Sequence, residues 1–245
     1  GEANTIGRSG TSWTSALTLS GDETQGATAF SCGSHTDVAG NAGATDTTAD
    51  SGSVTIDTIA PTMTITSSSV SSGGSTATAA IALTFTSSES TTNFVAGDIT
   101  VSGFSLGALS GSGTTYTATC TSTSDGTPAV SVAVSKYTDA TGNDNSVSNS
   151  YTWTYDSTAP TMVITSNAVS SGASTNTAEI GLIFTSSEAT SNFASGDITV
   201  SGCSLGSTFA ATLNNRVYTA TCTASSDGAI SVQVGADGFS DGDGN

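Results

Sequence analysis

The sequence predicts an all-β chain built from tandem β-sandwich modules joined end to end. Two observations carry this prediction. The phrase DTIAPTMTIT at residues 57–66 recurs as DSTAPTMVIT at residues 156–165, which is 99 residues later and about one domain length. After each copy come short stretches of alternating apolar and β-branched residues, which clusters of Gly, Ser, Asn and Asp separate.

The rest of the repeat defines three modules. NFVAGDITVSGFSLG (93–107) returns as NFASGDITVSGCSLG (192–206), and YTATCT (116–121) returns at 218–223. The offset grows from 99 to 102, so a three-residue insertion of the kind that loops accept lies between Leu205 and Tyr218. The final loop DATGN (139–143) matches DVAGN (37–41) and DGDGN (241–245). We therefore expect a partial module (the C-terminal half) at 1–56, a complete module at 57–155 and a module without its last strand at 156–245.

Alternation within the complete module predicts six strands, at residues 62–66, 80–86, 98–103, 115–121, 129–135 and 149–155. No segment has convincing helical periodicity. Six or seven short strands in about 100 residues fit an immunoglobulin-like sandwich, with a small barrel as the alternative. Pro61 and Pro160 hold the preceding alanines extended and lack an N–H, so they keep strand pairing from running through the junctions.

Composition excludes several classes of function. The chain has 3 Lys+Arg against 20 Asp+Glu, and its net charge is −17. Nucleic acid and anionic membrane surfaces are therefore not expected partners, because a protein binds either of them through basic side chains. No apolar run approaches the roughly 18 residues of a membrane span, so membrane insertion of this segment is not expected either.

The combination of D-x-T-A-P-T, G-D-I-T-V-S-G, Y-T-A-T and D-x-x-G-N resembles the bacterial-type immunoglobulin-like repeats of large surface proteins, including adhesins, cadherin-like arrays and extracellular filament proteins. The resemblance covers nearly the whole chain and is most specific over residues 57–245. It implies an extracellular or cell-surface location and a role as stalk, spacer or adhesive element, often stiffened by calcium.

Acidic residues recur at positions that an immunoglobulin-like topology brings to one end of each module, facing the preceding module. Carboxylates gathered there would repel one another, and Ca²⁺ takes six to eight oxygen ligands of this kind. We therefore expect interdomain Ca²⁺ sites. The alternative is turn chemistry, because Asp, Asn and Gly in D-x-x-G-N also make good turns and Asp98 and Asp197 can cap strand starts. The expected ligands are Asp57, Glu89, Asp98, Asp139 and Asn143, and then Asp156, Glu188, Asp197, Asp241 and Asn245.

Four cysteines bear on the compartment. Cys203 and Cys222 fall on neighbouring strand segments of one module, so we expect a disulfide between them, with two buried free thiols as the alternative. Cys32 and Cys120 are expected to be unpaired, or to pair across chains. A disulfide fits an oxidising, extracellular setting. The cysteine spacing and the single histidine argue against a zinc site.

No catalytic constellation stands out. The single histidine, His35, has Tyr137 and Phe239 at the corresponding places of the other repeats, which favours a surface or packing role over catalysis. Pairs such as Glu89 with Asp98 imitate a glycosidase site, but their repetition in consecutive modules favours a junction role. The sequence therefore predicts a structural, non-enzymatic array segment whose partners are neighbouring repeats.

Both chain ends fall inside modules, which also suits a filament whose copies complete one another's sheets by strand addition. One alternative is an adhesin module that binds a glycan or receptor through residues 207–217, where the insertion and Arg216 lie. Another is an accessory domain of a surface hydrolase.

Overall fold

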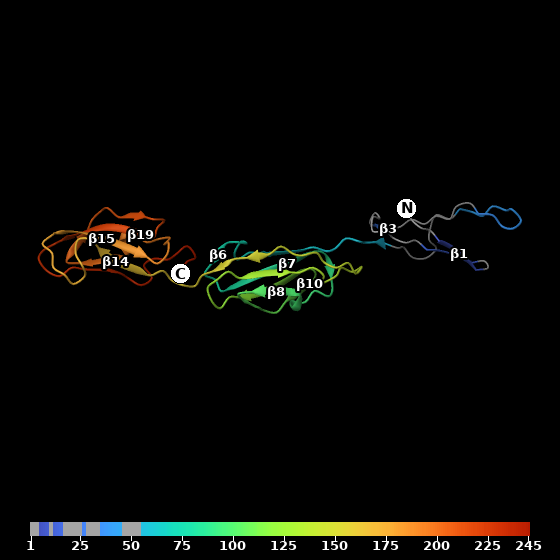
Figure 1. Ribbon diagram of the computed structural model, residues 1–245, viewed down its shortest axis with the longest axis horizontal. Coiled ribbons are helices and arrows are strands. Elements are labelled where there is room, and N and C mark those ends of the chain that lie inside the picture. Colours follow the sequence, from blue (N-terminus) through green and yellow to red (C-terminus); the bar gives the residue numbers. More distant parts are fainter. Residues whose placement is uncertain (1–4, 10–11, 17–25, 28–34, 46–54) are drawn as a thin grey trace.

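The computed structural model describes the chain apart from residues 1–4, 10–11, 17–25, 28–34 and 46–54. In its first part β1 (Thr5–Ser9) and β2 (Ser12–Ala16) form an antiparallel hairpin, and β3 (Gly26–Ala27) pairs with β4 (Thr55–Ile56). Residues 57–155 and 156–245 then form two modules that lie one after the other along the long axis (Figure 1). The described residues contain no α-helix, which confirms the all-β class.

The module at 57–155 is built on two main sheets, beside the small pair of β6 and β13 described below. The first has the order β5-β7-β10-β9, and the second has the order β12-β11-β8. In chain order these are the A-B-E-D and C-F-G sheets of a constant-type immunoglobulin domain, which confirms the sandwich rather than the barrel. The strands are β5 (Met63–Ser67), β7 (Ala80–Thr91), β8 (Ile99–Ser102), β9 (Ser105–Leu106), β10 (Ser110–Thr121), β11 (Ala129–Val132) and β12 (Tyr151–Thr152).

Alternation along β7 explains why this segment folds as a strand of a sandwich. Ile81, Leu83 and Phe85 are completely buried, while the residues between them point away from the core. Burying each side chain of this size stabilises the fold by about 1.5–3 kcal/mol. From the later part of the module Trp153 closes the core, with its ring centroid 5.3 Å from that of Phe104.

Four strands differ clearly from the sequence prediction. β7 continues to Thr91 and β10 begins at Ser110, so both are longer than expected, and two others are split or shortened. The segment expected as one strand at 149–155 is split into β12 and β13 (Thr154–Tyr155), because it changes partner: β12 pairs with β11, whereas β13 runs parallel to β6 (Ser75–Thr76). The strand expected at 129–135 ends at Val132, and Ser135 then takes a positive φ of 56° in a turn. A residue with positive φ cannot continue a β-strand.

The module at 156–245 repeats the arrangement. One sheet has the order β14-β15-β19-β17 with β18 also on β19, and β16 pairs with β20. The described residues contain no counterpart of β12 beside β20. The strands are β14 (Met162–Ser166), β15 (Glu179–Ser186), β16 (Ile198–Ser201), β17 (Cys203–Leu205), β18 (Ala210–Thr212), β19 (Val217–Ala224) and β20 (Ser231–Val234).

The three-residue insertion forms the tip of a hairpin between β18 and β19. Leu213, Asn214 and Asn215 take φ values of 52°, 55° and 60°, the left-handed region that asparagine tolerates better than most residues. Leu213 is 74% exposed at this tip. The insertion therefore lengthens a surface turn and leaves the sandwich unchanged.

The cysteines differ between the two modules. Cys203 of β17 and Cys222 of β19 form a disulfide, with their Cα atoms 5.8 Å apart. The corresponding positions in the preceding module hold Phe104 and the free, buried Cys120, and burial raises the pKa of the Cys120 thiol to about 12. Cys32 lies outside the described residues.

Candidate metal sites at the module junctions

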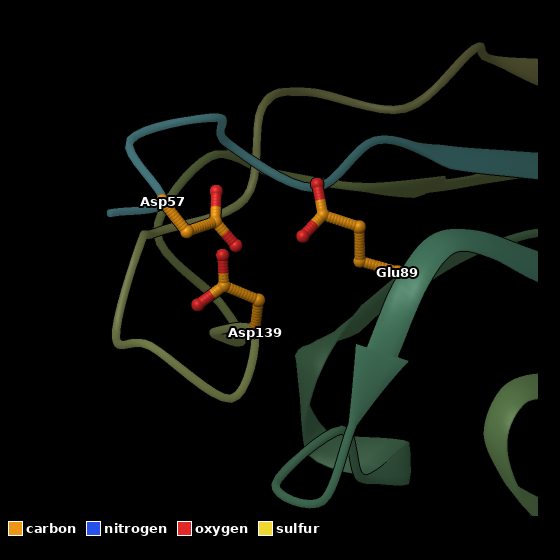
Figure 2. Close-up of side chains that lie close together, drawn as sticks. All are labelled: Asp57, Glu89 and Asp139. Carbon is orange, nitrogen blue, oxygen red and sulfur yellow. The ribbon is translucent and has the colours of Figure 1, made fainter. Parts of the chain in front are cut away.

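Three carboxylates meet at the N-terminal end of the module at 57–155. Asp57 lies in the linker before β5, Glu89 lies near the end of β7, and Asp139 lies in the loop that follows β11. Each offers an oxygen, and these oxygens all lie within 4.8 Å of one another. Figure 2 shows the three carboxylates turned towards one another from separate segments of the chain.

The loop around Asp139 is organised by its own carboxylate. Oδ1 accepts hydrogen bonds from the N–H groups of Thr141, Gly142 and Asn143 at 2.7–2.9 Å. Burial raises the pKa of Asp139, but the hydrogen bonds from Asn143 and Thr141 outweigh that effect and bring the pKa down to about 2. Asp139 is therefore a fixed negative charge at neutral pH although it is buried.

Glu89 responds in the opposite direction. Burial raises the pKa of its carboxyl, and the charges of Asp57 and Asp139 raise it further. The group is half-buried and placed against two carboxylates. The site consequently contains one carboxyl that is destabilised in its charged form, as expected where a cation would relieve repulsion.

Asn143 and Asp98 have other tasks. The Asn143 amide nitrogen donates to the backbone oxygen of Asp57 at 3.1 Å and to Asp139 Oδ2 at 2.8 Å, so this residue ties the loop to the linker. Asp98 does not join the three carboxylates. Its Oδ2 accepts the Val95 N–H at 2.8 Å and closes the short 3₁₀ turn Ala96–Asp98 just before β8, so its role is in a local turn.

The second module reproduces this geometry. Asp156, Glu188 and Asp241 each place an oxygen within 4.8 Å of the others. Asn245 donates to the Asp156 backbone oxygen at 2.9 Å and to Asp241 Oδ2 at 3.1 Å. Asp197 lies outside the group and accepts the Ala194 N–H at 2.8 Å. In each module the structure thus brings together four of the five expected residues, three as carboxylates and one as a brace.

The second cluster differs from the first by a nearby cation. Burial and the charges of Asp156 and Asp241 raise the pKa of Glu188, and the charge of Arg216 lowers it. The Arg216 guanidinium donates to the backbone oxygen of Ser187, next to Glu188. The hairpin that carries the insertion therefore brings a positive charge beside the second site.

Two contacts that fix the junction between the modules were not predicted from the sequence. Asp125 accepts hydrogen bonds from the Ser157 N–H and hydroxyl at 2.7 and 2.6 Å and from the Thr158 hydroxyl. Ser75 donates to Asp243 of the next module at 2.7 Å. Asp125 belongs to the tripeptide SDG, which occurs at 124–126 and again at 226–228. From the sequence alone this tripeptide predicts a turn but not a contact with the linker.

The loop of the partial module shows what turn chemistry achieves alone. Asp37 Oδ1 accepts the N–H groups of Ala39 and Asn41, and the Asn41 amide donates to Asp37 Oδ2 at 2.7 Å. Hydrogen bonds from Asn41 lower the pKa of this exposed carboxyl. The turn therefore forms in all three copies, and the modules at 57–155 and 156–245 add carboxylates from the linker and from the end of β7 or just after β15.

The chemistry of these groups is that of a hard-cation site. Calcium is bound by carboxylate oxygens with flexible geometry, and three carboxylates from a linker, a strand and a loop supply such ligands.

Among the described residues, no helix is long and apolar enough to cross a membrane.

Comparison with known families agrees with the repeat. The model of the bacterial Ig-like domain matches residues 57–155 and again residues 156–245. Domains of this kind in tandem are typical of surface proteins, where they serve as structural or adhesive modules and generally carry no catalytic site. Comparison with curated proteins gives no match. With more than half of its length covered by two consecutive copies, the chain belongs to the family of bacterial Ig-like domains.

Proposed function

We propose that this chain is a segment of an extracellular stalk, spacer or filament whose work is mechanical, and that Ca²⁺ bound at the module junctions stiffens it. The observation that carries the proposal is the repetition of one carboxylate cluster at the same end of consecutive modules. An active site has no reason to recur in this way, whereas a junction recurs with every module.

Protein contacts support a defined angle between the modules. Asp125 holds the linker residues Ser157 and Thr158, and Ser75 contacts Asp243 across the junction. The linker also contributes Asp156 to the carboxylate cluster. A cation bound by Asp156, Glu188 and Asp241 would therefore tie the linker to the body of the module.

Calcium titration of the full chain tests the metal. Thermal unfolding is followed in chelator and in rising Ca²⁺. A ligand that binds only the folded state raises stability by RT ln(1 + [L]/Kd), or about 2.7 kcal/mol at a hundredfold excess over Kd. A melting temperature that does not change between chelator and millimolar Ca²⁺ would refute the calcium sites.

A matched pair of variants locates the effect. Glu188→Gln removes a charge from the cluster, whereas Glu179→Gln removes one outside the cluster, at the start of β15, the strand that ends two residues before Glu188. We expect Glu188→Gln to lose the calcium response of its module and Glu179→Gln to keep it. Small-angle scattering of the wild-type chain in both buffers then reports whether calcium narrows the distribution of lengths.

Adhesion is the second candidate, and the β18–β19 hairpin favours it. The tip exposes Leu213, and the hairpin is absent from the preceding module. Binding of the chain to an array of glycans, compared with a variant in which Leu213 and Asn214 become glycine, tests this role. Equal binding by both proteins would exclude the hairpin as the adhesive element.

A further inference from the structure

The outward face of the sheet formed by β5, β7 and β10 carries threonine at neighbouring positions on all three strands. These side chains point away from the core and are exposed, except Thr84 at the centre, which is half-buried. We call the set the threonine array. It consists of Thr64 and Thr66 on β5, Thr84 and Thr86 on β7, and Thr115 and Thr117 on β10.

The strand register arranges the threonine array in two rows that cross the three strands. Neighbours in a row have Cβ atoms about 4.5–5.5 Å apart. The two rows are about 6.6–6.8 Å apart, because two residues of a strand separate them. The array is therefore a small lattice with two fixed repeats. The first row is Thr64, Thr86 and Thr115, and the second is Thr66, Thr84 and Thr117.

The hydroxyl groups of the threonine array are available to an outside partner. Within the described part of the chain, none of the six side chains is engaged in a hydrogen bond with another group of the protein. Threonine is branched at Cβ, so its χ1 angle is restricted and its methyl and hydroxyl groups keep fixed directions. Groups that are ordered beforehand lose little entropy when they bind.

The face around the array is neutral. The outward residues at 64–66, 80–86 and 115–121 are threonine or alanine, with no charged or aromatic side chain among them. The chain as a whole has a net charge of −17, and the carboxylate cluster of this module lies at its end. Because charged groups are costly to strip of water, a face without them suits an uncharged partner that has a rigid, repeating arrangement of hydrogen-bonding groups.

Strand propensity alone does not account for the array. Valine and isoleucine favour strands as threonine does. The module at 156–245 forms the same sheet with aliphatic residues at half of the corresponding positions, so the fold does not require these hydroxyl groups. In that module Val163, Ile183 and Val217 take the places of Thr64, Thr84 and Thr115.

We propose that the threonine array binds ice, and that its occupant is the prism face of hexagonal ice. Water oxygens on that face form rows whose two repeats are close to the spacings across and along the strands. Each threonine hydroxyl takes the place of a lattice water, since it both donates and accepts hydrogen bonds. A sheet twist of about 20–25° per strand moves the corners of so small an array out of plane by only about 1 Å.

Uptake of the full chain into ice is the direct test. The labelled chain is frozen slowly from dilute solution in chelator onto an ice surface, and the fraction incorporated is compared with that of labelled albumin. We expect uptake well above that of albumin, together with measurable thermal hysteresis. Thr86→Lys is expected to lower the uptake about tenfold or more, because a charged side chain at the centre of a row retains its own hydration shell.

Two matched variants carry the same charge elsewhere. Thr185 occupies the position of Thr86 in the later module, where aliphatic side chains interrupt the rows, so Thr185→Lys should keep the wild-type uptake. Thr100→Lys places the charge on β8, in the other sheet of the same module, and should also keep it. The melting temperature of each variant shows whether it is folded.

A gain of function gives the answer if Thr86→Lys fails to fold. Val163→Thr, Ile183→Thr and Val217→Thr, introduced together, complete both rows in the later module. The folded triple variant should be taken up into ice more strongly than the wild type, because it presents two arrays. Uptake equal to that of the wild type would count against the array as the binding face.

Uptake of the wild type no greater than that of albumin would overturn the proposal, and so would an equal loss in Thr86→Lys and Thr185→Lys. A chain that stays out of ice but binds insoluble cellulose, or dimerises in sedimentation, would assign the face to a neutral polysaccharide or to a second copy instead. Because uptake is measured in chelator, the result does not depend on the calcium sites.

Discussion

The Ser75 hydroxyl lies 2.7 Å from the Asp243 carboxylate and donates a hydrogen bond from one module to the next. Asp243 belongs to the same DGDGN loop as Asp241, which is part of the second carboxylate cluster. The loop that supplies the candidate metal ligand is therefore also the loop that touches the preceding module. The position of Asp241 in the carboxylate cluster is therefore linked to the position of Asp243 at the module junction by a segment of only three residues.

A variant that neutralises Glu89 distinguishes the repulsion among the three carboxylates from their binding of a metal ion. Glu89→Gln is expected to raise the melting temperature in chelator, because burial and two neighbouring carboxylates disfavour the charge there. The same variant should lose the stabilisation that calcium gives to its module. Calorimetry in chelator and in calcium measures both expected changes of the melting temperature. A variant with a lower melting temperature than the wild type in chelator would contradict the repulsion.

The dependence of stability on pH follows from two carboxyls with opposite shifts. Glu89 binds its proton more tightly in the folded state, so in chelator stability rises as the pH falls through its raised pKa towards the ordinary pKa of a glutamate. Asp139 has its pKa lowered to about 2, so its contribution is lost as the pH falls from about 4 to about 2. Unfolding by denaturant should show a maximum in mildly acidic buffer without metal, and calcium should remove the rise on the neutral side.

Removal of Asp125 should loosen the junction without unfolding either module. Asp125→Ala deletes the acceptor of the hydrogen bonds from Ser157 and Thr158. Asp227→Ala is the matched control, since Asp227 occupies the same SDG turn in the last module. Residual dipolar couplings should show that the two modules lose their common alignment tensor only in Asp125→Ala. An unchanged tensor would show that the hydrogen bonds to Asp125 are dispensable for the orientation of the modules.

Arg216 should make the second site weaker for calcium than the first. Its charge acts on Glu188, and the first cluster has no such neighbour among the groups that act on Glu89. Arg216→Gln is expected to tighten calcium binding at the second site by up to about fivefold, the effect of an exposed charge pair of about 1 kcal/mol. Isothermal titration measures the affinity, with Lys136→Gln as the charge-matched control.

Reduction should act on one module only. Opening the Cys203–Cys222 disulfide is expected to cost about 3 kcal/mol of stability, the typical value for a loop of this size. Cys120 should resist thiol reagents in the folded chain, because it is buried and its pKa is about 12. Unfolding of a Cys32→Ser chain with and without reductant, followed by mass spectrometry of labelled thiols, distinguishes the two modules.

The fold could be predicted from the sequence because its signal is periodic. Alternation such as that of residues 80–86 indicates a half-buried strand, and a repeat of 99 residues gives the module size directly. The split of 149–155 into β12 and β13 could not be predicted in this way. It depends on a change of partner from β11 to β6, and alternation along one strand carries no information about its partner.

The candidate site could be predicted in part for a similar reason. Topology placed Asp57, Glu89 and Asp139 at the same end of the module, and they do meet. Topology also placed Asp98 there, but the Val95 N–H lies three residues away and captures its carboxylate. Such local competition is decided by hydrogen-bond geometry within a few residues. The contact from Ser75 to Asp243 joins residues 168 positions apart and has no sequence signature.

The parallel pairing of β6 with β13 determines how the module at 57–155 would carry tension. The chain leaves this module directly after β13, where Thr154 lies opposite Ser75 and Tyr155 opposite Thr76. The Thr154 N–H donates to the Gly74 oxygen and the Asp156 N–H donates to the Thr76 oxygen. A pull on the C-terminal end of the module acts along β13, so these two bonds are loaded together in shear instead of opening one after another. These bonds, together with the two between Tyr155 and Gly126, are therefore the first that a stretching force loads at this end of the module.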